Sequence, residues 1–189
     1  MTLLIAGLIV FLGMHSVAIF APAAREQARA RLGEGTWKGI YSVVSLAGFV
    51  MIVYGFGWAR LSPVVLYSPP TWMRHVAFLL MLPVFPLFLA ANLPGRIKTA
   101  TKHPMLAAVK FWALAHLLAN GLLSDVLLFG GFLVWAVLDR ISLKRRTQHL
   151  RTMPPGRFND AIAVVLGLGL YVFFISWAHL RLFGVSPLG

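Results

Sequence analysis

Residues 104–139 read PMLAAVKFWALAHLLANGLLSDVLLFGGFLVWAVLD, two apolar runs joined at Asn120-Gly121. Each run is longer than a buried strand and neither alternates with period two, so both are predicted to be helices. Asn-Gly marks a turn, and helices with so short a connection are expected to form an antiparallel hairpin. Runs this apolar and this long indicate helices that cross a membrane.

The rest of the chain follows the same pattern. Of its 189 residues 59% are hydrophobic and 12% are charged, and the mean hydropathy is +0.82. Soluble domains have about 45–50% apolar and about 25% charged residues, so this composition is typical of a membrane protein. We therefore expect an all-α, polytopic transmembrane helical bundle, with residues 1–189 forming a single integral-membrane domain. The six predicted crossings are 2–22, 39–58, 73–93, 104–120, 122–139 and 159–180.

The positive charges predict the orientation of the bundle. Lys and Arg number 17 against 5 Asp and Glu, for a net charge of +12. Most of them follow the first, third and fifth predicted helices, so the positive-inside rule places those loops in the cytoplasm and both termini outside, in the periplasm. This rule and attraction to anionic lipid explain the charge without nucleic acid. The cations in those three loops are Arg25, Arg29, Arg31, Lys38, Arg96, Lys98, Lys102, Arg140, Lys144, Arg145, Arg146, Arg151 and Arg157.

Several classes of function have no residues to support them. The chain has no cysteine, which excludes disulfides, thiolate-bound zinc, iron–sulfur clusters and covalently attached haem. The five acidic residues fall in predicted loops or at helix ends, so no carboxylate pair is expected inside the membrane. The metalloprotease, serine-hydrolase and P-loop motifs are also absent from the sequence.

Two histidines are expected to lie near the middle of the membrane. His15 is well inside the first predicted helix and His116 well inside the fourth, so both are candidate axial ligands of a b-type haem, with iron as the metal. The open alternative is that both are structural and form hydrogen bonds across helices. Trp112 and Asn120 are four residues on either side of His116, which predicts one helix face. Lys110 either extends to the inner interface or pairs with a haem propionate.

Other features lie near helix ends or within loops. His75 and His179 are expected at the outer ends of helices, where an interfacial position beside an aromatic residue is the simpler interpretation. Pro83 and Pro86 interrupt the 73–93 run and are expected to kink it, because proline lacks a donor N–H. Residues 144–151 could continue the 122–139 helix as a basic surface helix.

Three segments resemble the NnrU family of bacterial membrane proteins: GLIVFLGMHSVAIFAP at 7–22, KHPMLAAVKFWALAHLLANG at 102–121 and DRISLKRR at 139–146. Members of this family are associated with denitrification. The resemblance implies a multi-pass protein of the bacterial inner (cytoplasmic) membrane. It also implies a redox, sensing or maturation role in nitrite and nitric oxide reduction, with denitrification enzymes as partners.

The same family is similar to 15-cis-zeta-carotene isomerase, a membrane enzyme with b-type haem. Its two haem-ligating histidines match His15, in His15-Ser16, and His116, in Trp112-Ala113-Leu114-Ala115-His116. A third histidine of that enzyme, needed for isomerisation, matches His75, which the resemblance therefore implies to be catalytic. The isomerase has a cysteine at the position of Ala113. A thiol-based exchange of ligands is thus excluded here, whereas His/His ligation is retained.

Three functions follow as expectations. The first is a haem b-binding membrane protein that supports nitrite and nitric oxide reduction. The second, which would make the chain an enzyme, is a haem-dependent cis–trans isomerase of a hydrophobic polyene. The third is a cofactor-free membrane scaffold. The partners implied are the lipid bilayer, haem, and either a hydrophobic small molecule or denitrification enzymes, and the sequence is compatible with an oligomer.

Overall fold

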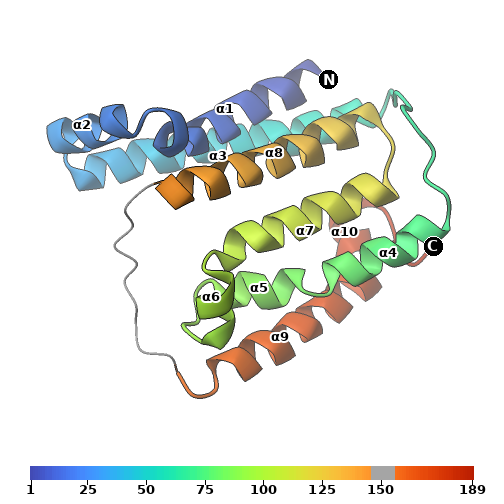
Figure 1. Ribbon diagram of the computed structural model, residues 1–189. Helices are drawn as coiled ribbons and strands as arrows, with labels where there is room; N and C mark the ends of the chain where they lie inside the picture. Colours follow the sequence, from blue (N-terminus) through green and yellow to red (C-terminus); the bar gives the residue numbers. More distant parts are fainter. Residues whose placement is uncertain (146–155) are drawn as a thin grey trace. The chain divides into compact units, whose positions relative to one another are not determined.

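The computed structural model describes residues 1–145 and 156–189, and the regular elements in these residues are all helices (Figure 1). The all-α class is thereby confirmed. Arg146 and Arg151, which belong to the basic segment after 122–139, lie outside the described residues. The elements are α1 (Thr2–Phe20), α2 (Pro22–Leu32), α3 (Glu34–Ala59), α4 (Trp72–Met81), α5 (Val84–Ala90), α6 (Arg96–Thr101), α7 (Pro104–Ala119), α8 (Leu123–Arg145), α9 (Asn159–Phe173), the π-helix η1 (Phe174–Ala178) and α10 (His179–Phe183).

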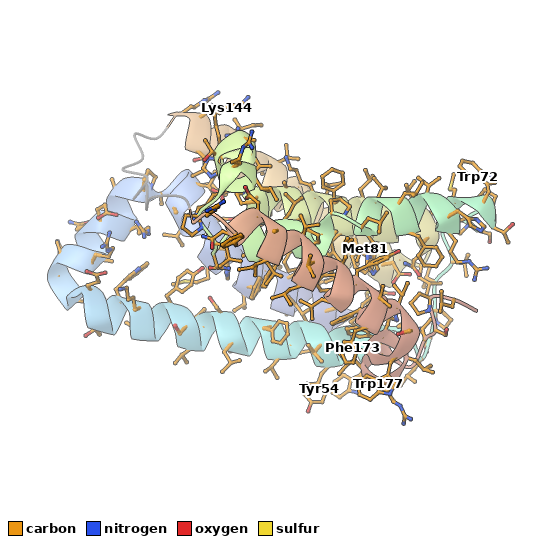
Figure 2. All side chains as sticks on the ribbon, turned by 90° about the horizontal axis from the view of Figure 1, so that it is seen from below. Tyr54, Trp72, Met81, Lys144, Phe173 and Trp177 are labelled. Carbon is orange, nitrogen blue, oxygen red and sulfur yellow. The ribbon has the colours of Figure 1, made fainter. Side chains whose placement is uncertain are left out.

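Five helical segments of the described residues are long and apolar enough to cross a membrane. They expose much of their apolar surface, and Figure 2 shows Tyr54, Phe173 and Trp177 projecting outward from their helices. Such surface suits contact with lipid, and the chain is therefore a multi-pass membrane protein. The five segments are Thr2–Phe20, Glu34–Ala59, Trp72–Ala90, Leu123–Arg145 and Asn159–Phe183.

The predicted crossing at 104–120 forms a helix of nearly the predicted length, but that helix is short for a membrane span. Helix α7 has 16 residues. At 1.5 Å per residue it is about 24 Å long, less than the roughly 30 Å of a bilayer's hydrocarbon core. The described residues therefore hold five candidate spans and one shorter apolar helix, rather than six equivalent crossings.

Two predicted loops contain helices. The segment after α1 forms α2, which begins with Pro22 at its first turn and has no buried residue. Its sequence, PAAREQARARL, is rich in Ala, Arg, Gln and Glu, which favour helix formation even where no apolar face is present. A helix without an apolar run is not predicted by hydropathy. Helix α6 lies likewise in the loop between the third and fourth predicted crossings.

The described residues form two compact units. One holds Met1–Pro69 and the segment with α8. The other holds Pro70–Ala119 and the segment with α9, η1 and α10. Helices α7 and α8, which the sequence predicts as a hairpin, pack within different units: α8 on α1, and α7 on α4 and α5.

In the first unit α1 lies along α3 with the two backbones in close approach (Figure 1). A Cβ atom added to Gly48 would meet the backbone nitrogen of Phe11 at 2.7 Å, and one added to Gly7 would meet that of Ile52 at 2.7 Å. A Cβ on Gly55 would overlap the backbone of Leu4. Small residues allow membrane helices to approach in this way, so these glycines set the α1–α3 contact.

In the second unit the 73–93 run is broken, as its prolines predict. Helix α4 ends at Met81 and α5 begins at Val84, so the break falls at Leu82-Pro83. Pro86 lies in the first turn of α5 and does not cause a second break, because the N–H groups there lack helical partners in any case. Helix α9 packs on α5, and the hydroxyl of Tyr171 donates to the carbonyl of Phe78 at 3.2 Å.

Gly55→Ala is expected to lower the free energy of unfolding by about 1–3 kcal/mol, because the new methyl group overlaps the α1 backbone. The matched control is Gly57→Ala on the same helix, where an added Cβ meets nothing within 4 Å. That variant should be neutral or slightly stabilising, since alanine favours helix more than glycine. Denaturant unfolding in detergent micelles measures both. Equal effects of the two substitutions would contradict the proposed role of Gly55.

Candidate functional site

His15 lies in α1 with its imidazole oriented by its own helix. The Nδ1 atom is 2.8 Å from the carbonyl oxygen of Phe11, one turn earlier. Because a carbonyl oxygen only accepts, Nδ1 must carry the hydrogen, and the lone pair of the neutral ring is then on Nε2. Metal-bound histidines commonly use this arrangement, in which one ring nitrogen donates to the protein and the other coordinates.

Aromatic rings from three helices surround His15. Phe11 stacks on it with ring centroids 4.2 Å apart and planes inclined by 25°. Tyr41 of α3 is 5.2 Å away, and Trp135 of α8 meets the imidazole edge-on at 5.9 Å. Among the described residues, the buried indole N–H of Trp135 has no hydrogen-bond acceptor. The surroundings of His15 are thus apolar, with one donor that a ligand could satisfy.

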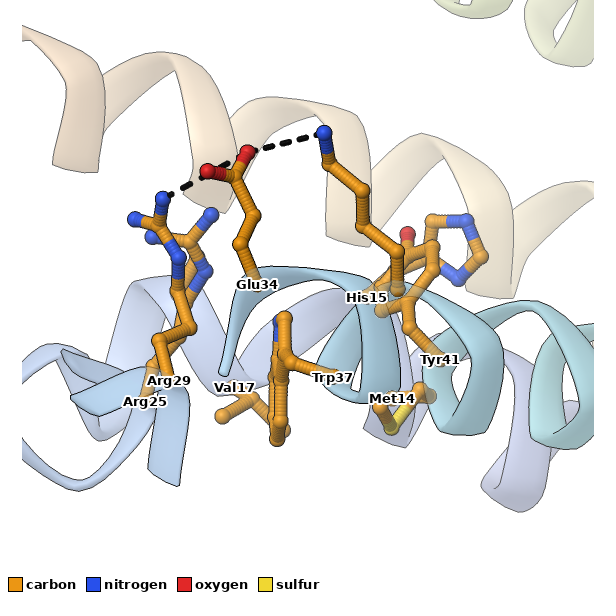
Figure 3. Close-up of a pocket in the computed structure, with 10 residues that line it drawn as sticks. Met14, His15, Val17, Arg25, Arg29, Glu34, Trp37 and Tyr41 are labelled. Carbon is orange, nitrogen blue, oxygen red and sulfur yellow. Dashed lines mark ion pairs between the residues drawn. The ribbon is translucent and has the colours of Figure 1, made fainter. Parts of the chain in front are cut away.

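A pocket of about 270 Å³ opens beside His15 in the same unit. Figure 3 shows Arg25 and Arg29 at one end of it, and His15 and Tyr41 at the other. Helices α1, α2 and α3 all contribute to its lining, which consists of Met14, His15, Val17, Ala18, Arg25, Arg29, Glu34, Trp37, Lys38 and Tyr41.

The cations of the pocket are partly neutralised. A Glu34 oxygen lies 2.8 Å from Nζ of Lys38 and 3.9 Å from Arg29 (Figure 3). Arg25 and Arg29 also contact Glu26, at 2.6 and 3.1 Å. Three cations against two carboxylates leave one net positive charge at this end of the pocket, which favours an anionic ligand over a cationic one.

His116 lies in α7 of the second unit, and its imidazole makes the same kind of hydrogen bond to its own helix as that of His15. Its Nδ1 is 2.9 Å from the carbonyl oxygen of Trp112, so Nε2 again carries the lone pair. The Trp112 ring is 5.5 Å away. His116 is in the last turn of α7, twelve residues after Pro104, and its expected depth in the membrane stays a prediction.

The structure places His179 beside His116, a proximity that sequence reasoning missed. Their ring centroids are 6.5 Å apart and their planes are inclined by 21°. Nδ1 of His179 donates to the carbonyl of Val185 at 2.7 Å. His179 follows the π-helix η1, and such turns occur often at functional sites. No signal in the sequence marks this turn, so the direction of His179 could not be predicted.

The other residues predicted for the site lie on α7, just after it, or on α4. Trp112 contacts His116 as expected, and Lys110 lies in the second turn of α7. Asn120 does not continue the helix face, because it follows the end of α7 and its carbonyl accepts from the hydroxyl of Tyr67 at 2.7 Å. His75 is exposed in the first turn of α4, and the catalytic role implied for it stays a prediction.

The Asn120-Gly121 corner is held by the loop that follows α3. The backbone N–H groups of Leu66 and Tyr67 donate to the carbonyl of Gly121 at 2.9 and 3.3 Å, and a Cβ on Gly121 would overlap Tyr67. Partial burial and the nearby carboxylate of Asp125 raise the pKa of Tyr67, so its hydroxyl remains a donor at neutral and mildly alkaline pH.

Comparison with known proteins identifies the chain over nearly its whole length. A family model described as NnrU protein matches residues 3–187. No curated protein and no solved structure matches the chain.

Tyr67→Phe is expected to lower the free energy of unfolding by about 1 kcal/mol, because it removes the hydrogen bond to Asn120. The matched control is Tyr54→Phe on the exposed face of α3, which should be neutral. Thermal unfolding in detergent compares the two. Equal stability of the two variants would show that the Tyr67 hydroxyl does not hold the corner.

Proposed function

The chain belongs to the NnrU family, and from this premise we propose that it binds haem b through His15 and His116 and carries electrons in support of nitrite and nitric oxide reduction. The observation that carries the proposal is the hydrogen bond that each of the two imidazoles makes with its own helix. Each donates its Nδ1–H to the carbonyl four residues earlier, which makes Nε2 the coordinating atom. The resemblance to the haem-containing isomerase independently selects the same two residues.

The residues around His15 fit a haem in their chemistry. Phe11, Tyr41 and Trp135 form an apolar surround for a flat aromatic ligand, and the unpartnered Trp135 N–H supplies a donor for it. Neutral imidazole is a common axial ligand of haem iron in proteins. Around His116, Trp112 supplies a comparable aromatic neighbour.

The two ligands also indicate what kind of chemistry to expect. When bound, haem b would supply a one-electron carrier. His15 and His116 would hold the group, and iron held by two imidazoles would favour electron transfer over the binding of a gas molecule. Each imidazole is held by a hydrogen bond to its own helix, which would orient it toward such a group.

The role in the cell follows from the family and the membrane character. We place the protein in the bacterial inner membrane with α7 as a short sixth crossing, the basic loops in the cytoplasm and both termini in the periplasm, as the positive-inside rule favours. From there it would pass electrons to, or support the assembly of, enzymes that reduce nitrite and nitric oxide. The resemblance to the NnrU family carries this part of the proposal.

The test is the absorption spectrum of the protein purified in detergent from cells supplied with a haem precursor. The wild type should show a Soret band that shifts on reduction. His15→Ala and His116→Ala should each lose most of the Soret band, because one of the two proposed imidazole ligands is removed. External imidazole should restore part of the band in both variants if they remain folded.

His75→Ala is the control, because His75 is exposed and should not affect the band. His179→Ala tests the neighbouring histidine and should also keep it. A colourless, folded wild type would contradict haem binding. Loss of the band in His179→Ala with its retention in His15→Ala would overturn the assignment of the ligand pair.

A further inference from the structure

The pocket beside His15 connects an iron-ligand candidate with a group of cations. His15 lies at one end, and Arg25, Arg29 and Lys38 line the same cavity (Figure 3). The lining between them includes Val17 and other apolar side chains. A ligand that fills this pocket must therefore combine an apolar body with an anionic edge.

The size of the pocket indicates that it holds only part of a ligand. Its volume is about 270 Å³. Pockets that enclose whole drug-sized ligands have roughly 300–1,000 Å³, so this cavity suits one edge of a larger flat molecule.

We propose that this pocket receives the propionate carboxylates of the haem coordinated by His15, with Arg25 and Arg29 as their main partners. The proposal rests on the proposed function, because it names the groups that bind the anionic edge of the same ligand. It differs from the sequence-based expectation that Lys110 pairs with a propionate. The lining of this pocket comes from α1, α2 and α3, whereas Lys110 lies on α7, and its role stays a prediction.

The order of residues along the chain suits this assignment. Haem b carries both propionates on one edge of an otherwise apolar ring. His15 precedes the end of α1 at Phe20 by five residues, on the order of 7.5 Å along the helix axis. Helix α2 begins directly afterwards and presents Arg25 and Arg29. The coordinating imidazole is thus within the apolar helix, and the cations lie just beyond its end.

Arginine is well suited to binding a propionate carboxylate, whereas the negative charge of Glu34 opposes the binding of an anion in this pocket. A guanidinium group forms two parallel hydrogen bonds to a carboxylate, which fixes the carboxylate's orientation. Glu34 lies 3.9 Å from Arg29 and 2.8 Å from Lys38, so its negative charge competes with an incoming carboxylate. Removing this charge should strengthen binding of an anionic ligand and leave binding of a neutral analogue unchanged.

The experiment compares haemin with haemin dimethyl ester, which has the same ring but no free carboxylates. Each is titrated into the full-length haem-free protein in detergent, and the Soret band reports the dissociation constant. The wild type should bind haemin more tightly than the ester. Arg25→Gln and Arg29→Gln should each weaken haemin binding by about fivefold, the effect of one partly exposed ion pair, with no change for the ester. Glu34→Gln should tighten haemin binding alone.

Arg31→Gln is the matched control, because Arg31 is on the same helix and does not line the pocket. His15→Ala should weaken binding of both probes, and micelles without protein give the level of binding by detergent alone. If the wild type binds neither probe, the proposed function fails. If it binds both equally and the arginine variants do too, haem binding stands and the propionate assignment is overturned. A loss caused by Lys110→Gln in place of the arginine variants would restore the sequence-based assignment.

Discussion

The backbone of α1 lies directly against the backbone of α3, because Gly7, Gly48 and Gly55 have no side chains at the contact. In hydrocarbon, close packing replaces the hydrophobic effect as the main attraction between helices, so such contacts determine which helices associate. This contact brings Tyr41 of α3 to the imidazole of His15 on α1. It also forms two walls of the pocket that α2 completes.

The imidazole orientation depends on a second constraint, the need of polar groups in a membrane for partners. In α1 and α7 the carbonyl four residues before each histidine supplies that partner. The helix thereby satisfies one nitrogen of each imidazole and leaves the other nitrogen for coordination. At the α2 end of the pocket Glu26 and Glu34 partly offset the charges of Arg25, Arg29 and Lys38.

Sequence reasoning succeeded where the physical cause is local along the chain. Proline predicted the break at Leu82-Pro83, because its missing N–H acts within one turn. Sequence reasoning failed where the interaction partner of a residue is distant in the sequence. Asn120 was expected on the face of a longer helix, but α7 ends before it, at a corner bound by Tyr67. Helix α2 was missed because propensity alone, without an apolar face, supports it.

The sequence by itself determined that the chain is helical, that most of its helices can cross a membrane, and that His15 and His116 are the polar side chains to consider. Hydropathy and residue type suffice for these conclusions. Only the tertiary structure decided that His179 stands beside His116, and that Arg25, Arg29 and Lys38 share a pocket with His15. Such proximities depend on how each helix is rotated and on turns such as η1, and these are set by contacts between residues far apart in the chain.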